Sequence, residues 1–352
     1  MRLDEEPGSS GREDQILRRG PVSRPANLAP HRRLDHLRWN DTERQAWRRP
    51  NDRVAARSGF VATPAAQIGP VTLGLMVAPA DRLDTFRALH QAGCFVIPNP
   101  WDVGSARLLA GLGFKALATT SAGFAWSLGQ ADNGVTLDEV LEHLRAVAAS
   151  VDVPVNADFE GGFAIEPDAV AANVGRASET GIAGLSIEDS SGDPAEPLFA
   201  FDLSVARIRA ARQAIDDHGG RVLLTGRSEG FVVGRPDLDD TIRRLQAYAD
   251  AGADCLYAPR LGTLDEIAAV VTAVAPKPVN VLVGSDFTTV AALADLGVRR
   301  ISVGGGLARV AWGAFLLAAK EIAEGGTFEG LARGIPFAEI DGAFASDADP
   351  GT

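Results

Sequence analysis

Short runs of apolar residues alternate with longer amphipathic segments from residue 95 onward. Eight of these runs have the length and the flanking turn residues of buried strands. These predicted strands are Phe95–Ile97, Ala116–Thr119, Val155–Ala157, Gly184–Ile187, Val222–Leu224, Cys255–Tyr257, Val279–Leu282 and Arg300–Val303. Between them, apolar residues recur with the period of an α-helix in Leu137–Ala149, Asp168–Thr180, Val205–Asp217, Leu238–Ala251, Leu264–Val274 and Thr288–Leu296. Eight strands alternating with helices predict an α/β fold of the (β/α)8, or TIM barrel, type.

Glycines mark several of the predicted helix ends. Gly113, Gly181, Gly252 and Gly297 each stand between an amphipathic segment and the next strand, where a left-handed residue commonly ends a helix. A doubly wound sheet is the alternative fold. It would need a glycine-rich loop after the first strand, whereas the chain has Asn99-Pro100-Trp101-Asp102 there.

Charge divides the chain into two chemically different segments. Residues 1–75 contain 13 arginines and 9 acidic residues, and the whole chain has a formal net charge of −12. We interpret 1–75 as a disordered or over-extended N-terminal segment and 76–345 as the barrel domain, with Met76 as a candidate natural start. An export signal of the twin-arginine type, after Arg48-Arg49, is the alternative, although prolines interrupt the weakly apolar run that follows.

Composition also limits the partners. A net charge of −12 argues against a nucleic-acid partner, because phosphate neutralisation needs a basic surface. The same prolines argue against a membrane span. The 2 cysteines are far apart and form no metal motif, which is typical of a reducing compartment, so a cytoplasmic location is expected.

The candidate chemistry lies where strands end, because TIM barrels carry their active sites at the carboxyl ends of the strands. All 5 histidines fall in the N-terminal segment or on predicted helices, which disfavours a histidine triad or a histidine-rich zinc site. Lys115, Lys277 and Lys320 are also away from strand ends, so a Schiff-base mechanism has no candidate. Carboxylates, hydroxyls and one arginine, Arg227, remain.

Three carboxylates should lie close together at this end of the barrel. Asp158 and Glu160 follow the third strand, and Glu188 follows the neighbouring fourth strand. Such a group raises the pKa of its members unless a cation neutralises it. Oxygen ligands favour Mg²⁺ or Mn²⁺, and Arg227 opposite them could hold a substrate carboxylate through two hydrogen bonds. Ordinary ion pairs at the barrel rim are the alternative interpretation of these charges.

The order of these motifs resembles the isocitrate lyase/phosphoenolpyruvate mutase superfamily from about Phe95 to Arg309. The segments that carry the resemblance are Pro98-Asn99-Pro100-Trp101-Asp102, Thr119-Thr120-Ser121-Ala122-Gly123, Leu128-Gly129 with Asp132, Asn156-Ala157-Asp158-Phe159-Glu160-Gly161-Gly162-Phe163, Ile187-Glu188-Asp189, Gly226-Arg227, Pro278-Val279-Asn280-Val281 and Gly297-Val298-Arg299-Arg300-Ile301-Ser302-Val303-Gly304. The resemblance implies a phosphoenolpyruvate/pyruvate-type barrel and Mg²⁺-dependent cleavage of a bond next to a 2-oxo acid, through an enolate.

Roles follow from the resemblance for most of the candidate residues. It implies Asp158, Glu160 and Glu188 as direct or water-mediated Mg²⁺ ligands, with Asp132 supporting the water shell of the metal. Thr120 and Ser121 would donate to the 2-oxo acid end of the substrate, and Arg227 would bind a carboxylate. Substrate binding is also expected of Trp101, Asp102, Asn280 and Ser302. Members of the superfamily exchange the last barrel helix between subunits, which implies a homo-oligomer, dimer or tetramer.

One departure from the superfamily pattern concerns the loop after the fourth strand. Isocitrate and methylisocitrate lyases carry a Lys-Lys-Cys-Gly-His loop there, whereas this chain has Asp189-Ser190-Ser191-Gly192-Asp193-Pro194-Ala195-Glu196. Glu196 and Glu229 are the remaining candidate acids. Three functions stay open: a carbon–carbon lyase or oxaloacetate hydrolase acting on a small di- or tricarboxylate; a P–C bond enzyme such as a phosphonopyruvate hydrolase or phosphoenolpyruvate mutase, which could use Arg235 or Arg260; and a catalytically silent metabolite-binding barrel.

Overall fold

The computed structural model describes residues 79–345, so residues 1–75 and Met76 lie outside the described part of the chain. Its strands are β1 (Phe95–Ile97), β2 (Leu117–Ala118), β3 (Val155–Asp158), β4 (Gly184–Glu188), β5 (Leu223–Arg227), β6 (Cys255–Tyr257), β7 (Val279–Leu282) and β8 (Arg300–Ser302). Its helices are α3 (Pro79–Gln91), α4 (Val103–Gly111), α5 (Ser121–Ser127), α6 (Leu137–Ala149), α7 (Pro167–Ser178), α8 (Phe201–Asp217), α9 (Leu238–Asp250), α10 (Leu264–Val274), α11 (Val290–Asp295), α12 (Gly306–Gly325), η1 (Glu329–Arg333, a 3-10 helix) and α13 (Phe337–Phe344).

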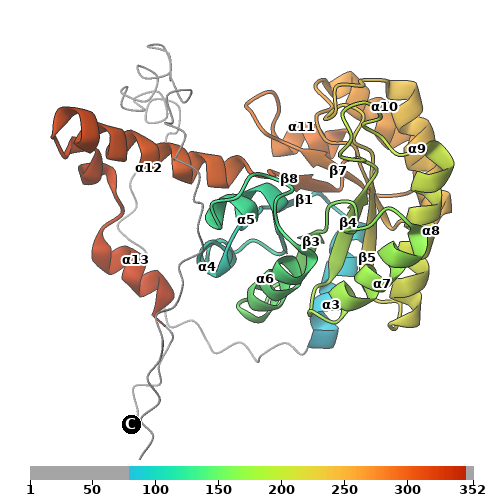
Figure 1. Ribbon diagram of the computed structural model, residues 1–352, viewed down its shortest axis with the longest axis horizontal. Helices are drawn as coiled ribbons and strands as arrows, with labels where there is room; N and C mark the ends of the chain where they lie inside the picture. Colours follow the sequence, from blue (N-terminus) through green and yellow to red (C-terminus); the bar gives the residue numbers. More distant parts are fainter. Residues whose placement is uncertain (1–78, 346–352) are drawn as a thin grey trace, which may run out of the picture. The chain divides into compact units, whose positions relative to one another are not determined.

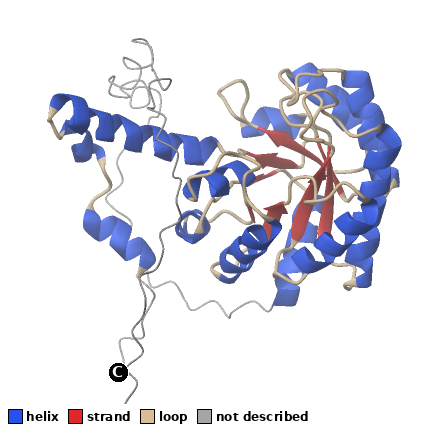
Figure 2. Ribbon diagram, viewed as in Figure 1, coloured by secondary structure: helices blue, strands red, loops and turns tan. Residues whose placement is uncertain are grey.

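The eight strands form one parallel sheet, which confirms the predicted α/β barrel. Their order is β1-β8-β7-β6-β5-β4-β3-β2, and helices surround the strands (Figures 1 and 2). No ladder joins β1 to β2. β1 and β2 are instead connected by the hydrogen bond from Ala118 N to Pro98 O (3.0 Å) and by hydrogen bonds of the Asn99 side chain. Asn99 donates to Thr119 O and accepts from the backbone N–H groups of Val303 and Gly304, so one amide ties β1, β2 and β8 together.

Apolar packing lies mainly between the strands and the helices around them. The largest cluster of buried side chains draws on α6 to α10 and on β3 to β8, and includes Leu144, Leu185 and Tyr248. A smaller cluster joins Phe86 of α3 to Ile97 and Leu223. The glycines predicted at helix ends, Gly113, Gly181, Gly252 and Gly297, all have positive φ, which confirms that interpretation.

Three strands that carry site residues run further than the apolar pattern indicates. Asp158 and Glu188 are the last residues of β3 and β4, and β5 continues to Arg227 instead of ending at Leu224. The register pairs Glu188 with Arg227 across β4 and β5. Because polar side chains that face the inside of a barrel interrupt an apolar run, the pattern ends before the strand does.

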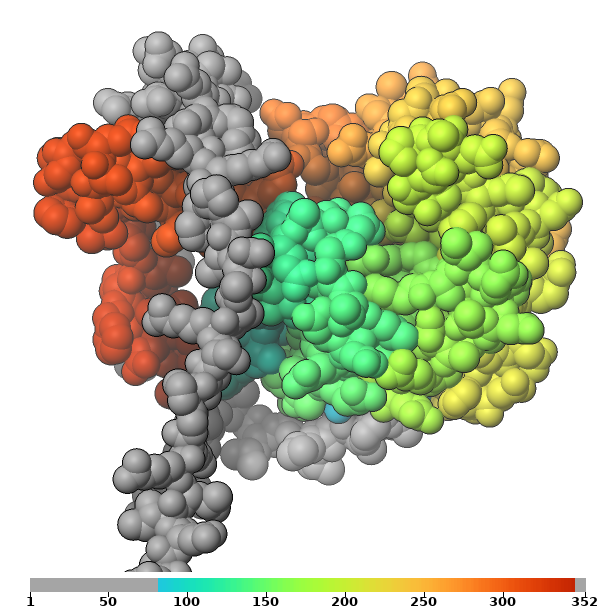
Figure 3. All heavy atoms as spheres, in the orientation of Figure 1, coloured from blue at the N-terminus to red at the C-terminus, as the bar shows by residue number. Residues whose placement is uncertain are grey.

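The C-terminal segment leaves the barrel with many apolar side chains exposed. Only Ala308 of α12 is buried, and Figure 1 shows the helix leading away from the strands. In Figure 3 the red atoms of the C-terminal segment lie to one side of the green and yellow atoms of the barrel. Exposed apolar residues continue beyond it in Phe328, Leu331 and Phe337. The segment returns to the barrel through α13, where Arg107 donates to Phe344 O (3.1 Å). No helix within residues 79–345 has the length and apolar character needed to cross a membrane.

The start of α4 revises the expectation for Asp102. The Asp102 carboxylate accepts from Ser105 N (2.6 Å), and Ser105 Oγ accepts from the Asp102 backbone, which is a reciprocal capping box. Its side chain therefore serves as the N-cap of the helix, and Asp102 is not among the residues that line the cavity at the strand ends.

We expect Asp102→Ala to lower the free energy of unfolding by about 1 kcal/mol, because it leaves an N–H of the first helical turn without its acceptor. Asp102→Asn, which keeps an acceptor and removes the charge, should restore most of that stability in urea unfolding. Equal stability of the alanine variant and the unaltered protein would contradict the capping role.

Candidate active site

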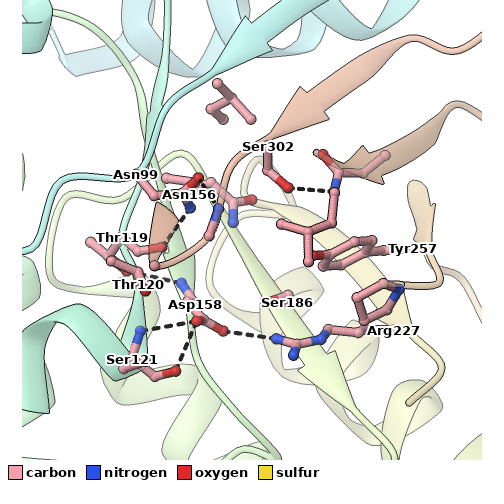
Figure 4. Close-up of a pocket in the computed structure, with 18 of the residues that line it drawn as sticks. Asn99, Thr119, Thr120, Ser121, Asn156, Asp158, Ser186, Arg227, Tyr257 and Ser302 are labelled. Atoms are coloured by element: carbon pink, nitrogen blue, oxygen red, sulfur yellow. Dashed lines mark hydrogen bonds and ion pairs between the residues drawn. The ribbon is translucent and has the colours of Figure 1, made fainter. Parts of the chain in front are cut away.

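A cavity of about 240 Å³ opens at the carboxyl ends of the strands. Residues from all eight strands or their following loops line it. Figure 4 shows side chains from β3, β5 and β8 pointing into the same space. Its polar lining consists of Asn99, Thr119, Thr120, Ser121, Asp132, Asn156, Asp158, Ser186, Arg227, Tyr257, Arg260, Asn280, Arg300 and Ser302.

Arg227 is the centre of the charges at this end of the barrel. Its guanidinium lies 2.9 Å from Glu188 Oε2, 3.2 Å from Asp158 Oδ1 and 2.5 Å from Glu229 Oε1. The guanidinium also lies over the ring of Tyr257, at 5.3 Å from its centroid. Burial opposes the charged form of Arg227, yet the three carboxylates raise its pKa well above the ordinary value. Arg227 is therefore a permanent cation.

Asp158 is held in place by the end of β2. Its backbone N–H donates to Thr119 Oγ1 (2.9 Å), and its Oδ2 accepts from both the N–H and the hydroxyl of Ser121 at 3.0 Å (Figure 4). Asp132 lies nearby: burial and the charge of Asp158 raise its pKa. Thr120, in contrast, uses its side chain to cap α5, accepting from Gly123 N.

Glu160 has a strained backbone and an unsatisfied carboxylate. Its φ of 48° is left-handed, a conformation that non-glycine residues adopt only when the surroundings enforce it. Burial, followed by the charges of Asp158 and Asp132, raises its pKa to about 7. Its Oε1 is buried and has no hydrogen-bond partner. One oxygen of the carboxylate therefore lacks a hydrogen-bond donor.

A buried arginine fixes the loops that carry Glu160 and Glu188. Arg207 donates to the carbonyls of Glu188 (3.0 Å), Ala164 (3.1 Å) and Gly161. The Glu188 N–H donates to Glu160 O at 3.0 Å, so the ends of β3 and β4 are joined directly. Burial, the leading cause, raises the pKa of Glu188 well above its ordinary value despite the nearby Arg227 charge.

Asp189 supports the adjacent loop and does not face the cavity. Its carboxylate accepts from the Tyr248 hydroxyl (2.6 Å), from Arg244 (3.2 Å) and from Glu229 N (2.7 Å). This buried network places Glu229 beside Arg227. Burial raises the pKa of Glu229. Neither Glu229 nor the exposed Glu196 lines the cavity, so the two acids suggested by the sequence lie outside it.

The carboxylates fit a hard divalent cation. All donors are oxygens, and Glu160 Oε1 is an orphaned buried acceptor of the kind that a cation or its water would satisfy. Within residues 79–345, no three histidine, cysteine, aspartate or glutamate side chains are already grouped as ligands of one ion. This is compatible with Mg²⁺, which usually keeps several waters and takes only one or two protein carboxylates.

The structure brings most of the predicted site residues into one cavity. The predicted residues that line it are Asp132, Asp158, Thr120, Ser121, Arg227, Asn280 and Ser302. Glu160 and Glu188 do not line the cavity themselves, but they lie next to Asp158 and Arg227, which do. Trp101 and Asp102 are not brought into it: Trp101 contacts α5, where a Cβ at Gly123 would meet its side chain at 2.9 Å.

Several lining residues were not expected from the sequence. Asn156, Ser186, Tyr257 and Arg300 lie inside predicted strands, and only the register of the barrel shows that they face inward. Burial raises the pKa of Tyr257 to about 12, so its hydroxyl stays protonated near neutral pH. Arg260 also lines the cavity, whereas Arg235 does not.

Comparisons with known proteins agree with this geometry. Residues 86–323 match the family described as phosphoenolpyruvate phosphomutase. An uncharacterized protein of Mycobacterium tuberculosis is 36% identical over 258 residues, which are 73% of this chain and 94% of that protein. The structure of a provisionally assigned lyase/mutase from Burkholderia cenocepacia is 50% identical, has a TM-score of 0.74 and covers 76% of this chain and 97% of its own.

A second solved structure, 2,3-dimethylmalate lyase, is described as a member of the PEP mutase/isocitrate lyase superfamily. It is 25% identical, has a TM-score of 0.66 and covers 77% of this chain and 95% of its own. Barrel topology, the charged cavity and these matches lead to one assignment. The chain belongs to the phosphoenolpyruvate phosphomutase family, within the isocitrate lyase/phosphoenolpyruvate mutase superfamily of lyases and mutases.

Proposed function

We propose that this protein is a Mg²⁺-dependent carbon–carbon lyase that releases a 2-oxo acid from a small di- or tricarboxylate. The observation that carries the proposal is the position of Arg227 within a group of buried or partly buried carboxylates that adjoins the cavity. Membership of a superfamily of lyases and mutases supports the reaction class. An oxaloacetate-type hydrolase would use the same residues.

Different residues around the cavity can serve different roles in such a reaction. Arg227 offers an N–H donor beside Asp158, where a substrate carboxylate could bind through a charge-assisted hydrogen bond. The hydroxyl groups of Thr119 and Ser121 hold Asp158 still, which fixes the direction of the negative charge. Tyr257 and Ser302 offer hydroxyl groups inside the cavity. A water-excluding barrel interior strengthens each of these interactions.

Mg²⁺ would be held by Asp158 with Glu160, Glu188 and Asp132 acting directly or through water. When bound, it supplies positive charge that stabilises the oxygen of an enolate. The unsatisfied Oε1 of Glu160 supports this assignment, since a buried carboxylate without a partner is costly. Burial, together with the charges of neighbouring carboxylates, raises the pKa values of Asp132, Glu160 and Glu188, and a bound cation would favour their ionised forms.

A P–C bond enzyme is the second candidate, and one observation favours it. Three arginines, Arg227, Arg260 and Arg300, line the cavity. A phosphonate carries more negative charge than a carboxylate and would use such additional cations. A silent metabolite-binding barrel is the third candidate; retention of the strained, crowded carboxylates argues against it, because they lower stability without a cation.

We also propose a homo-oligomer in which the C-terminal segment of one copy packs on another copy. Exposed apolar residues are concentrated in this segment: Leu307 (37%), Val310 (62%), Phe315 (59%), Phe328 (63%), Leu331 (59%), Ile335 (61%) and Phe337 (81%). A concentration of exposed apolar side chains in one segment is typical of a protein contact. Either a dimer or a tetramer would cover these side chains.

A coupled assay for 2-oxo acid release tests the proposed reaction. Substituted malates, citrates, oxaloacetate and phosphonopyruvate should be offered with and without Mg²⁺, and we expect Mg²⁺-dependent release from a carboxylate. Release of both a 2-oxo acid and phosphate from phosphonopyruvate would favour the P–C enzyme.

Glu188→Ala should lower kcat/KM at least about 100-fold, because preorganised charge contributes that much. The exposed Glu196→Ala is the control; retained turnover in Glu188→Ala would refute the metal-assisted mechanism.

Glu160→Gln should stabilise the metal-free protein above pH 7. The folded pKa of Glu160 is about 7, against an ordinary 4.5. The stability linked to this group is therefore full below pH 4.5 and is lost as the pH rises through 7. At pH 8 we expect the variant to be more stable in urea by on the order of 1–2 kcal/mol, and Mg²⁺ to reduce that difference. The exposed Glu166→Gln is the control, and equal stability of Glu160→Gln and the unaltered protein would contradict the expectation.

Phe315→Glu combined with Phe337→Glu should dissociate the oligomer. A carboxylate at these positions would have to be buried in the proposed contact, which is unfavourable without a partner. Light scattering coupled to size exclusion should show a lower mass for the variant. Ile165→Glu, exposed to 57% on a barrel loop, is the matched control and should leave the mass unchanged. A monomeric unaltered protein would refute the proposal.

A further inference from the structure

The floor of the cavity contains a buried positive charge. Arg300, the first residue of β8, is only 3% exposed but lines the cavity. Its Nε donates to Asn280 Oδ1 (2.9 Å), and one terminal nitrogen donates to Thr225 Oγ1 (3.0 Å). Both acceptors are neutral. The guanidinium is thus held firmly in one orientation without any neutralisation of its charge.

The second terminal nitrogen of Arg300 also faces neutral groups. It lies 3.3 Å from His90 Nε2 and 3.5 Å from Asn156 Oδ1. His90 Nδ1 lies 2.8 Å from Phe86 O, so it donates there and leaves Nε2 to accept from Arg300. Burial, followed by the Arg300 charge, lowers the pKa of His90 to about 3, which keeps the imidazole neutral.

Arg300 differs in this respect from the other arginines buried near the site. Arg227 pairs with three carboxylates and Arg244 with two. Within residues 79–345, Arg300 takes part in no ion pair. Burying an uncompensated guanidinium is expensive, and the corresponding interior layers of TIM barrels are usually filled by Val, Ile and Leu. Packing alone therefore does not account for Arg300.

Hydrogen bonds connect this charge to the middle of the cavity. Asn280, which accepts from Arg300, donates through Nδ2 to Ser302 Oγ (2.9 Å). The Ser302 hydroxyl accepts this bond and also interacts with the Tyr257 hydroxyl, which lines the same cavity. Arg300, Asn280 and Ser302 thus form a series of hydrogen-bonding groups that leads from the floor toward the ligand space. Such a series suits a negatively charged oxygen.

We propose that Arg300 recognises a second carboxylate of the substrate at the cavity floor, directly and through Asn280 and Ser302. The reacting end of the molecule then lies at the rim, next to Arg227 and the carboxylates. The cavity, with a volume of about 240 Å³, thereby selects small dicarboxylates over monocarboxylates. The placement of the reacting end at the rim rests on the proposed function, whereas the test of the floor site measures binding and requires no turnover.

Matched pairs of ligands test the proposal by calorimetry on the full chain with saturating Mg²⁺. Malonate, succinate and glutarate are each compared with their monoamides, which have nearly the same size and one negative charge less. We expect at least one diacid to bind about tenfold or more tightly than its monoamide. Arg300→Gln should reduce this preference to below about threefold, with little change for the monoamide. Arg209→Gln, an exposed arginine outside the cavity, should keep the full preference.

Several outcomes would overturn the inference. Equal affinity of every diacid and its monoamide for the unaltered protein would refute it without any variant, as would a full preference in folded Arg300→Gln. If Arg300→Gln fails to fold, Arg300→Lys replaces it in the test. Lysine has fewer N–H donors than arginine, so the preference for the diacid should fall at least about threefold. An unchanged preference would refute the role of Arg300 in binding the second carboxylate. A preference that depends on Arg300 in a protein without turnover would uphold the floor site and reject only the proposed reaction.

Discussion

One partly buried arginine surrounded by carboxylates sets the constraints on the catalytic end of this barrel. Arg227 cannot neutralise Asp158, Glu188 and Glu229 together, and burial still leaves the pKa values of Glu188 and Glu229 raised. The surrounding structure enforces the arrangement: Arg207 ties the loops after β3 and β4, and Asp189 holds the loop after β5. The arrangement of charges at the cavity therefore lowers the stability of the fold locally, as is common at functional sites.

The cavity consequently has two ends of opposite charge. The rim is negative, since the carboxylates outnumber Arg227, and the floor is positive because of Arg300. A cation is attracted to one end and an anion to the other. A small acid that bridged a rim cation and the floor arginine would satisfy both ends at once and would be oriented before any bond changed. The polar interior of the barrel, unusual for the fold, is what makes this orientation available.

The sequence predicted the fold better than it predicted the site. Three strands and two helices have the predicted bounds, because apolar periodicity reports directly on burial. Asp158 and Arg227 were found because they stand where apolar runs stop. Arg300 and Tyr257 were missed because they lie within strands, where only the register shows which side chains face inward. Asp102 was assigned to binding because a capping carboxylate and a ligand-binding carboxylate look alike in a sequence.

The loop after β4 limits where a proton can come from. It lacks the cysteine, lysines and histidine of isocitrate and methylisocitrate lyases, and its first residue, Asp189, is fully engaged in a buried network. Glu196 is exposed and outside the cavity lining. Under the proposed lyase function, the proton that reaches an enolate must therefore come from the barrel interior or from water. Tyr257, protonated and inside the cavity, has the position for this role, and Ser302 beside it connects that hydroxyl to the Arg300 floor. The same series of hydrogen bonds would then both bind the distal carboxylate and support the proton donor.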